Sequence, residues 1–193
     1  MSERVSTRDA FARALAEVGA EDQRIVAVAA DSQSRYGSFA RDFPERNINV
    51  GIAEQNMIGI AAGLALEGKI ALVTAYATFL SMRCLEQVRT DVAYERLNVK
   101  LVGTDAGFSS GYLGFTHQAL EDIGIMRSIP NMVIIDPADA GETYLATRAM
   151  LEWEGPVYLR IRGRAAEPLI SWPDNEFRIG KGRILREGHD ATI

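Results

Sequence analysis

Short apolar runs alternate along the chain with longer stretches in which apolar residues recur every three or four positions. The short runs are apolar almost throughout, rather than at every second residue, which is typical of parallel strands covered on both faces. They predict six strands, at Ile25–Ala30, Ile48–Val50, Ile70–Thr74, Val99–Gly103, Met132–Ile135 and Val157–Ile161.

The stretches between these runs predict helices. Ser6 or Thr7 can cap a first helix that continues to Val18 with one apolar face. The segment Ile52–Leu66 is apolar nearly all round, so we expect a helix that is buried rather than amphipathic. Further helices are predicted over Thr78–Tyr94, Leu120–Arg127 and Ala140–Trp153.

This order of elements predicts an α/β domain with a doubly wound, mostly parallel six-stranded sheet and helices on both faces. Ligands of such sheets bind beyond the carboxyl ends of the strands. The loops Asp31–Gly37 and Thr104–Phe115 each follow a predicted strand, and the second loop is rich in glycine and serine. We therefore expect the ligand site at this edge of the sheet.

The alternation of strands and helices breaks after Arg162. The last residues, Asp190–Ile193, are typical of the start of another buried strand. We expect residues 1–165 to form the domain, and residues 166–193 to be a linker and the start of a C-terminal domain that is otherwise absent.

The composition restricts the classes of function. A net charge of −5 with scattered Lys and Arg argues against a nucleic-acid or anionic-membrane partner. The single cysteine, Cys84, excludes an intrachain disulfide and suits a reducing cytosol. The two histidines, His117 and His189, are too far apart to suggest a metal cluster, and no apolar run is long enough to span a bilayer. We expect a cytoplasmic protein that has no metal site of its own.

Glu54 opens a helix that is otherwise made of small and apolar residues. An isolated acid in a first turn most often serves only the helix dipole. Here Gly59, Ala61, Ala62 and Gly63 let neighbouring elements approach closely, so we expect Glu54 to be only partly hydrated. A desolvated carboxyl has a raised pKa and can donate a hydrogen bond near neutral pH.

The sequence Gly51-Ile-Ala-Glu54-Gln-Asn-Met57, followed by a helix rich in Gly and Ala, resembles the pyrimidine-binding domain of the transketolase family, especially its split forms with two polypeptides. The resemblance covers residues 1–165 and implies the thiamine diphosphate-binding fold, with residues 166–193 beginning a C-terminal transketolase-like domain. It implies that Glu54 bonds N1′ of the cofactor's aminopyrimidine ring, which favours the imino tautomer that deprotonates thiazolium C2.

The segment Thr74–Arg89 extends the resemblance without gaps. In the family, aromatic residues three positions apart pack on the aminopyrimidine ring. Phe79 matches the stacking position, and Tyr76 and Met82 match the walls of the pocket. Asp31, which follows the first strand, is a further candidate for cofactor binding.

Thr116-His117-Gln118 is a third match, and it implies that His117 contacts the donor sugar near the reacting carbon. Two nearby positions depart from the family. Asp105 replaces a histidine that contacts the sugar phosphate, and a carboxylate repels a phosphate at close range. Leu113 lies where common transketolases have an aspartate that binds a donor hydroxyl.

Arg8, Arg35 and Arg160 lie near positions where the family binds phosphate with Arg, Lys or Ser. We hypothesise that the substrate, a sugar or sugar phosphate, differs from a typical ketose phosphate, or that its phosphate binds elsewhere. The sequence does not identify the ketose donor or the aldehyde acceptor.

The chain contains no Gly-Asp-Gly motif, which in this family binds the cofactor's diphosphate through Mg²⁺. The resemblance therefore implies that a separate subunit holds Mg²⁺ and the diphosphate, in an α2β2 assembly around a homodimer of this chain. The expected activity is two-carbon ketol transfer from a ketose to an aldehyde. The alternatives are a deoxyxylulose-phosphate-synthase-like subunit, the β subunit of a 2-oxo-acid dehydrogenase, and a non-catalytic assembly subunit.

Overall fold

A computed structural model describes residues 4–170, 176–182, 184 and 187–190. Its main sheet has six strands in the order β3-β2-β4-β5-β7-β6, and every neighbouring pair is parallel. The expected doubly wound α/β fold with six parallel strands is confirmed. The strands are β2 (Ile25–Ala29), β3 (Asn47–Asn49), β4 (Ile70–Tyr76), β5 (Val99–Thr104), β6 (Val133–Ile135) and β7 (Val157–Arg160).

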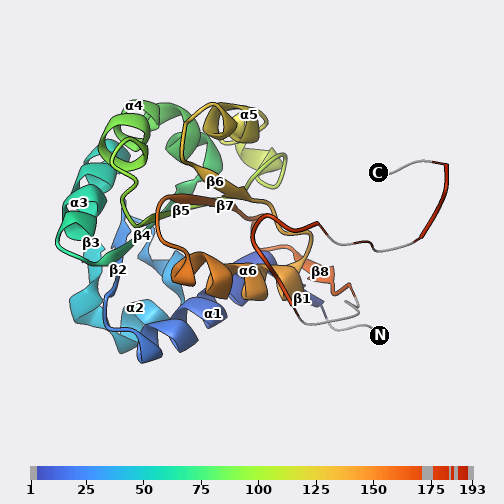
Figure 1. Cartoon of the computed structure of the whole chain (residues 1–193), viewed down its shortest axis with the longest axis horizontal. Helices are drawn as coiled ribbons and strands as arrows, with labels where there is room; N and C mark the ends of the chain where they lie inside the picture. The colour runs from blue at the N-terminus through green and yellow to red at the C-terminus, as the bar shows by residue number, and fades with distance from the viewer. Residues whose placement is uncertain (1–3, 171–175, 183, 185–186, 191–193) are drawn as a thin grey trace.

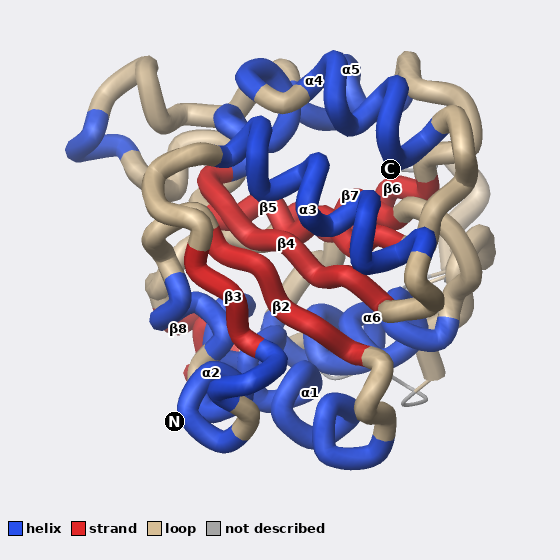
Figure 2. The backbone as a smooth tube through the Cα atoms, turned by 90° about the vertical axis from the view of Figure 1, so that its left-hand side faces the viewer, coloured by secondary structure: helices blue, strands red, loops and turns tan. Residues whose placement is uncertain are grey.

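Helices cover both faces of this sheet (Figures 1 and 2). On one face lie α1 (Thr7–Glu21), α2 (Ser38–Asp42) and α6 (Ala140–Glu152). On the other lie α3 (Glu54–Leu66), α4 (Leu85–Gln87) and α5 (Asp122–Arg127). Each face has its own apolar core cluster, because the strands carry buried side chains on both sides.

Side-chain caps fix the N-termini of α1 and α6. Ser6 Oγ accepts a hydrogen bond from the backbone N–H of Asp9 at the start of α1. Asp139 caps α6 with one carboxylate oxygen, and its other oxygen accepts from the backbone N–H of Ile170. Each cap satisfies a donor that would otherwise be unpaired at a helix N-terminus.

The prediction of one regular helix over Thr78–Tyr94 is wrong in detail, because the helical segment there is irregular. Two π-helical segments, η3 (Phe79–Arg83) and η4 (Val88–Ala93), flank the short α4. Ser81 Oγ donates a hydrogen bond to the carbonyl of Ala77, and side-chain bonds of this kind compete with the backbone hydrogen bonds of a regular helix. The segment between β2 and β3 also differs from the expected loop, because it contains η1 (Gln33–Tyr36), α2 and η2 (Pro44–Arg46).

The expectation that Ile52–Leu66 is buried all round is wrong. Met57 and Ile58 are fully buried against the sheet, whereas Leu66 is 69% exposed. A side chain built at Gly59 or Gly63 would meet nothing within 4 Å. The surface of α3 that carries Gly59, Gly63 and Leu66 is therefore apolar, and none of the described residues covers it.

A second, two-stranded sheet joins the start of the domain to the segment that follows β7. The strand β1 (Arg4–Ser6) pairs antiparallel with β8 (Ala166–Pro168). Residues 166–168 thus pair with the domain that was expected to end at 165. The strand expected at Asp190–Ile193 lies mostly outside the described residues. Residues 171–175 also lie outside them.

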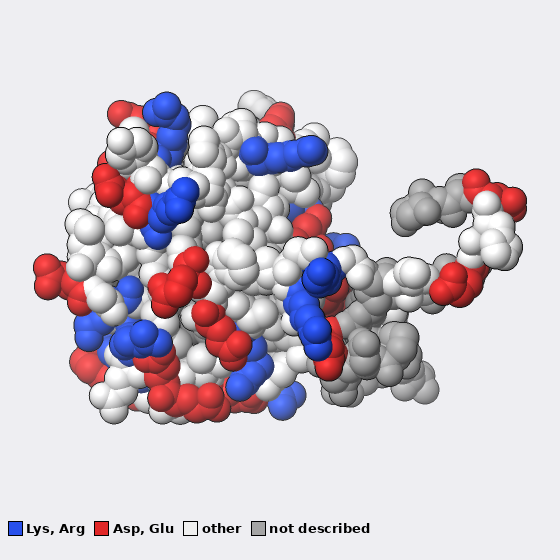
Figure 3. Space-filling model, viewed as in Figure 1, with Lys and Arg blue, Asp and Glu red and all other residues white. Residues whose placement is uncertain are grey.

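Figure 3 shows basic and acidic side chains interspersed on one face of the molecule. Within the residues that the structure describes, no helix has the length and apolar character needed to cross a membrane.

Candidate functional site

Three rings that the sequence singled out meet beyond the carboxyl end of β4. Tyr76 ends that strand, Phe79 begins η3, and His117 lies in the loop after β5. The ring centroids are 5.3 Å apart for Tyr76 and Phe79, 4.8 Å for Tyr76 and His117, and 5.1 Å for Phe79 and His117. His117 Nδ1 lies 2.9 Å from the hydroxyl of Thr116. The structure therefore builds one aromatic cluster from two strand ends.

Glu54, the first residue of α3, is 6% exposed, as its small neighbours predicted. Its carboxylate forms an ion pair with Arg83, and Arg83 Nη1 lies 2.9 Å from Glu54 Oε2. The guanidinium of Arg83 also lies 4.1 Å from the centroid of the Phe79 ring. Arg83 connects the acid to the aromatic cluster, and sequence reasoning missed it. The ion pair offsets part of the cost of burying the carboxylate.

Met82 and Asp31 lie at the edges of this arrangement. Met82 is exposed, and its sulfur accepts a hydrogen bond from the hydroxyl of Thr78. Asp31 is exposed and has a left-handed backbone with φ of 68°, while its N–H donates to the side chain of Asn49. Their contacts with a cofactor stay predictions.

A cavity of about 460 Å³ opens next to Tyr76. Its charged lining residues are Arg8, Arg35 and Arg164 together with Asp105. The remaining lining residues are Ser32, Ser34, Ser109, Tyr112 and Ala165. The cavity lies at the edge of the sheet where the sequence predicted a ligand site.

Arg35 is the most deeply placed cation of this cavity. Its guanidinium lies 4.4 Å from the centroid of Tyr76, and its Nε has no hydrogen-bond partner within the described part of the chain. Burial lowers the pKa of Arg35, an effect that Tyr76 and Asp105 oppose. Burial, and then the charges of Arg164 and Arg35, lower the pKa of Arg8, while Asp105 opposes this shift. Three cations around one carboxylate make the cavity suited to an anion.

Asp105 is held in place by its surroundings. Its backbone is left-handed with φ of 57°, and its Oδ1 accepts a hydrogen bond from Ser110 Oγ at 3.0 Å. A side chain at Gly163 would come within 2.7 Å of Asp105 Oδ1, so only glycine fits there without a shift. The carboxylate therefore has a fixed place among the arginines.

The structure does not bring Arg160 into the cavity. Its Nε donates to Asp122 Oδ2 at 2.8 Å, and its Nη atoms reach Asp136 and the carbonyl of Ala119. Arg160 thus belongs to a largely buried hydrogen-bond network. Arg164, rather than Arg160, lines the cavity. Leu113, in η5 (Gly111–Leu113), is also outside the lining, where Tyr112 is present instead.

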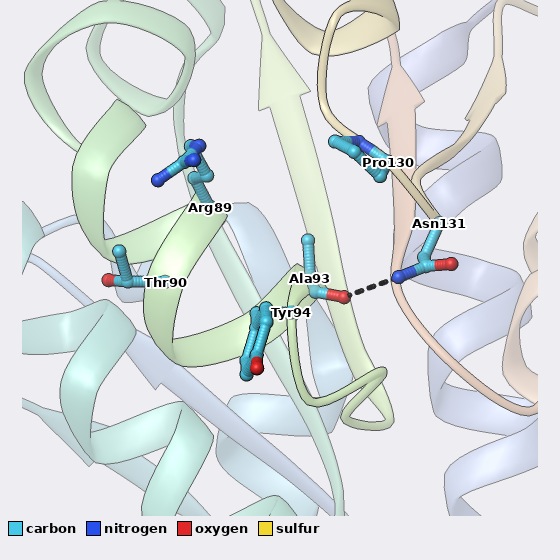
Figure 4. A pocket seen from close by; sticks show the side chains of 6 residues that line it. All are labelled: Arg89, Thr90, Ala93, Tyr94, Pro130 and Asn131. Carbon is cyan, nitrogen blue, oxygen red and sulfur yellow. Dashed lines mark hydrogen bonds between the residues drawn. The ribbon is translucent and has the colours of Figure 1, made fainter.

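A second cavity, of about 230 Å³, lies at the amino ends of β5 and β6 (Figure 4). It is lined by Arg89, Thr90, Ala93, Tyr94, Pro130 and Asn131. The side chain of Asn131 donates to the carbonyl of Ala93 at 3.0 Å. This cavity is at the opposite edge of the sheet from Glu54. No group of three or more His, Cys, Asp or Glu residues that could hold a metal ion was found among the described residues.

A family model described as the pyrimidine binding domain of transketolase matches residues 3–166. The chain is 45% identical over 189 residues to a putative transketolase C-terminal section of Methanocaldococcus jannaschii, which covers 96% of this chain and 60% of the relative. It is 44% identical over 188 residues to a 6-deoxy-6-sulfo-D-fructose transketolase subunit of Clostridium sp., which covers 96% of this chain and 58% of the relative.

A solved structure described as a split gene transketolase, inactive β4 tetramer, matches with a TM-score of 0.85 and 44% identity. That match covers 96% of this chain and 60% of the other. The chain thus spans about 60% of the length of each of these three proteins. Since the family model covers nearly all of the domain, the chain belongs to the transketolase pyrimidine-binding domain family.

Proposed function

We propose that this chain is the pyrimidine-binding subunit of a split, thiamine diphosphate-dependent transketolase-like enzyme. Such an enzyme moves a two-carbon ketol unit from a ketose donor to an aldehyde acceptor. The observation that carries the proposal is the buried carboxylate of Glu54, connected through Arg83 to the face of Phe79. A buried acid beside an aromatic face suits a planar nitrogen heterocycle.

Each residue of the cluster has a proposed task. Glu54 bonds N1′ of the aminopyrimidine, Phe79 stacks on that ring, and Tyr76 walls the pocket. Met82 and Asp31 complete the cofactor contacts. His117 packs edge-on against Tyr76, and it contacts the donor sugar near the carbon that reacts with the cofactor. The bound cofactor supplies the electron sink for cleavage of the carbon–carbon bond.

We further propose that a partner subunit supplies the diphosphate and Mg²⁺ site in an α2β2 assembly. The chain has no Gly-Asp-Gly motif, which supports this division. The apolar, uncovered face of α3 offers a surface for assembly next to Glu54. The related structure described as an inactive β4 tetramer supports the expectation that this chain alone is inactive.

The donor of this proposed enzyme carries an anionic end, which binds among Arg8, Arg35 and Arg164. Asp105 lowers the positive charge of the cavity, so it weakens the attraction for a phosphate dianion more than for a monoanion. One relative is named for a sulfonated sugar, whose sulfonate is a monoanion. We therefore propose a donor other than a common ketose phosphate.

The cofactor role is tested by Glu54→Gln in the chain assembled with its partner subunit. We expect turnover to fall by at least about 100-fold, because an amide cannot exchange the proton that activates the aminopyrimidine. Glu86→Gln, an equivalent change at an exposed position of α4, is the control and should leave turnover unchanged. Unchanged turnover in Glu54→Gln would reject the catalytic role and favour an assembly subunit.

The substrate proposal has its own assay. The assembled enzyme is offered xylulose 5-phosphate and a sulfonated ketose at equal concentration, with wild-type chain and with Asp105→Asn. We expect poor use of xylulose 5-phosphate by the wild type, and a lower KM for it in the variant. Efficient turnover of xylulose 5-phosphate by the wild type would disprove the altered specificity.

A further inference from the structure

We propose that Arg83 occupies the aminopyrimidine position in the cofactor-free chain, and that the cofactor ring must displace it in order to bind. This inference rests on the proposed function. Arg83 occupies both places that the proposed function assigns to the ring: it forms an ion pair with Glu54, with Nη1 2.9 Å from Oε2, and its guanidinium lies 4.1 Å from the centroid of Phe79.

The geometry makes the two occupants mutually exclusive. A separation of 4.1 Å from the Phe79 centroid is van der Waals contact, so no second flat group fits between the guanidinium and the ring. The face of Phe79 that Arg83 covers is also the face toward Glu54, because the same guanidinium forms the ion pair with that carboxylate. A heterocycle that bonds Glu54 and stacks on Phe79 needs that same space.

The chemistry of the guanidinium explains why it fits there. It is planar, it carries N–H donors in its plane, and it stacks on aromatic faces. An aminopyrimidine is planar as well and bonds the same carboxylate through a ring nitrogen. Arg83 thus imitates the ring in its planar shape and in its pairing with the Glu54 carboxylate.

The burial of the two partners shows which one can move. The side chain of Glu54 is 7% exposed, so its charge needs a partner whenever the cofactor is absent. The side chain of Arg83 is 45% exposed, although its Nη1 lies 2.9 Å from the Glu54 carboxylate. It can swing into solvent at small cost, because an exposed arginine is readily hydrated. Arg83 therefore keeps the acid paired until the ring arrives.

The turn that carries Arg83 supports this exchange. Phe79 and Arg83 are the two ends of the π-helical segment η3, and the backbone N–H of Cys84 bonds the carbonyl of Phe79. The wide turn places the arginine over the ring that precedes it by four residues. A local change of the Arg83 rotamer frees the ring without moving the backbone.

The test measures the dissociation constant of thiamine diphosphate, with Mg²⁺, by calorimetry on the chain assembled with its partner subunit. The variants are Arg83→Met, which keeps an apolar stem, and Arg83→Gln, which keeps one planar donor group. We expect Arg83→Met to bind about 3- to 10-fold more tightly than the wild type, since the competing ion pair and cation–π contact are gone. Arg83→Gln should lie between the two.

Arg89→Met removes an exposed arginine from η4 and serves as the matched control, with unchanged affinity expected. Equal or weaker binding in both Arg83 variants would overturn the inference, because Arg83 would then be a permanent partner of Glu54 or of the cofactor. A wild-type assembly that does not bind thiamine diphosphate would instead reject the proposed function itself. The two failures are therefore distinguishable.

Discussion

Replacement of Lys100 by methionine tests how a buried lysine makes the stability of the fold depend on pH. Lys100 lies in β5 and is fully buried, and its Nζ donates to the carbonyls of Trp153 at 2.5 Å and Gly155 at 2.7 Å. These bonds attach the end of α6 to the sheet. Burial lowers the pKa of Lys100 to about 7, an effect that the charge of Glu154 opposes only in part.

The lowered pKa of Lys100 makes the free energy of unfolding rise with pH above about 7. Below pH of about 7 both the folded and the unfolded chain bind the lysine proton, so the full cost of burying the charge is present. Between that pH and the ordinary lysine pKa of about 10.4, only the unfolded chain keeps the proton, and stability rises with pH. At about 1.4 kcal/mol per pKa unit, the gain from pH 7 to pH 9 is about 2 kcal/mol.

The assay is urea unfolding of the full chain at several pH values from about 7 to 9. The free energy of unfolding of wild type minus that of Lys100→Met should rise by about 2 kcal/mol across this range, because methionine binds no proton. Lys69→Met, at an exposed lysine, should show no such rise relative to the wild type. Parallel pH profiles for wild type and Lys100→Met would refute the reasoning.

Three further predictions use other buried groups. Burial, helped by the charge of Glu54, raises the pKa of Cys84 to about 12, so iodoacetamide at pH 8 should label the unfolded chain but not the native chain; rapid native labelling would contradict this. Gly103→Ala should destabilise the chain by about 2 kcal/mol in urea unfolding, because the new Cβ would come within 3 Å of the Tyr158 ring. Gly111→Ala, where a Cβ meets nothing, is its control, and equal stabilities would refute the steric argument. Asp139→Ala should lower the free energy of unfolding by about 1 kcal/mol and speed limited proteolysis next to Ile170, since it removes both the cap of α6 and the acceptor of the Ile170 N–H; wild-type cleavage rates would contradict this anchoring role.

The strands were predictable from the sequence because a short run of consecutive apolar residues is typical of a parallel strand that is buried on both faces. All six lie within about two residues of the expected bounds, which is the usual uncertainty at element ends. The π-helical segments were not predictable, since the apolar pattern of Thr78–Tyr94 fits a regular helix equally well. The burial of α3 was misjudged because an apolar sequence does not tell whether the same chain covers it.

The candidate site was predictable where a residue type is rare in its context. Glu54 is a lone acid in an apolar helix, so its position drew notice. Arg83 was missed because an arginine one turn beyond an aromatic residue is most often a solvated charge. Three arginines occupy alternate positions from the end of β7 onward, and only the structure separates them: Arg160 donates to Asp122, Arg162 donates to Glu167, and Arg164 lines the cavity.

The antiparallel pairing of β1 with β8 brings the entry and the exit of the domain together at one place (Figure 1). Arg8 and Arg164, which line the cavity, are each a few residues from this pair. A domain whose two junctions meet can be inserted into a longer polypeptide, or separated from it, without rearrangement of its sheet. The same layout would place any polypeptide joined at either junction beside the cavity that Arg8 and Arg164 line, where it could contribute to the choice of substrate.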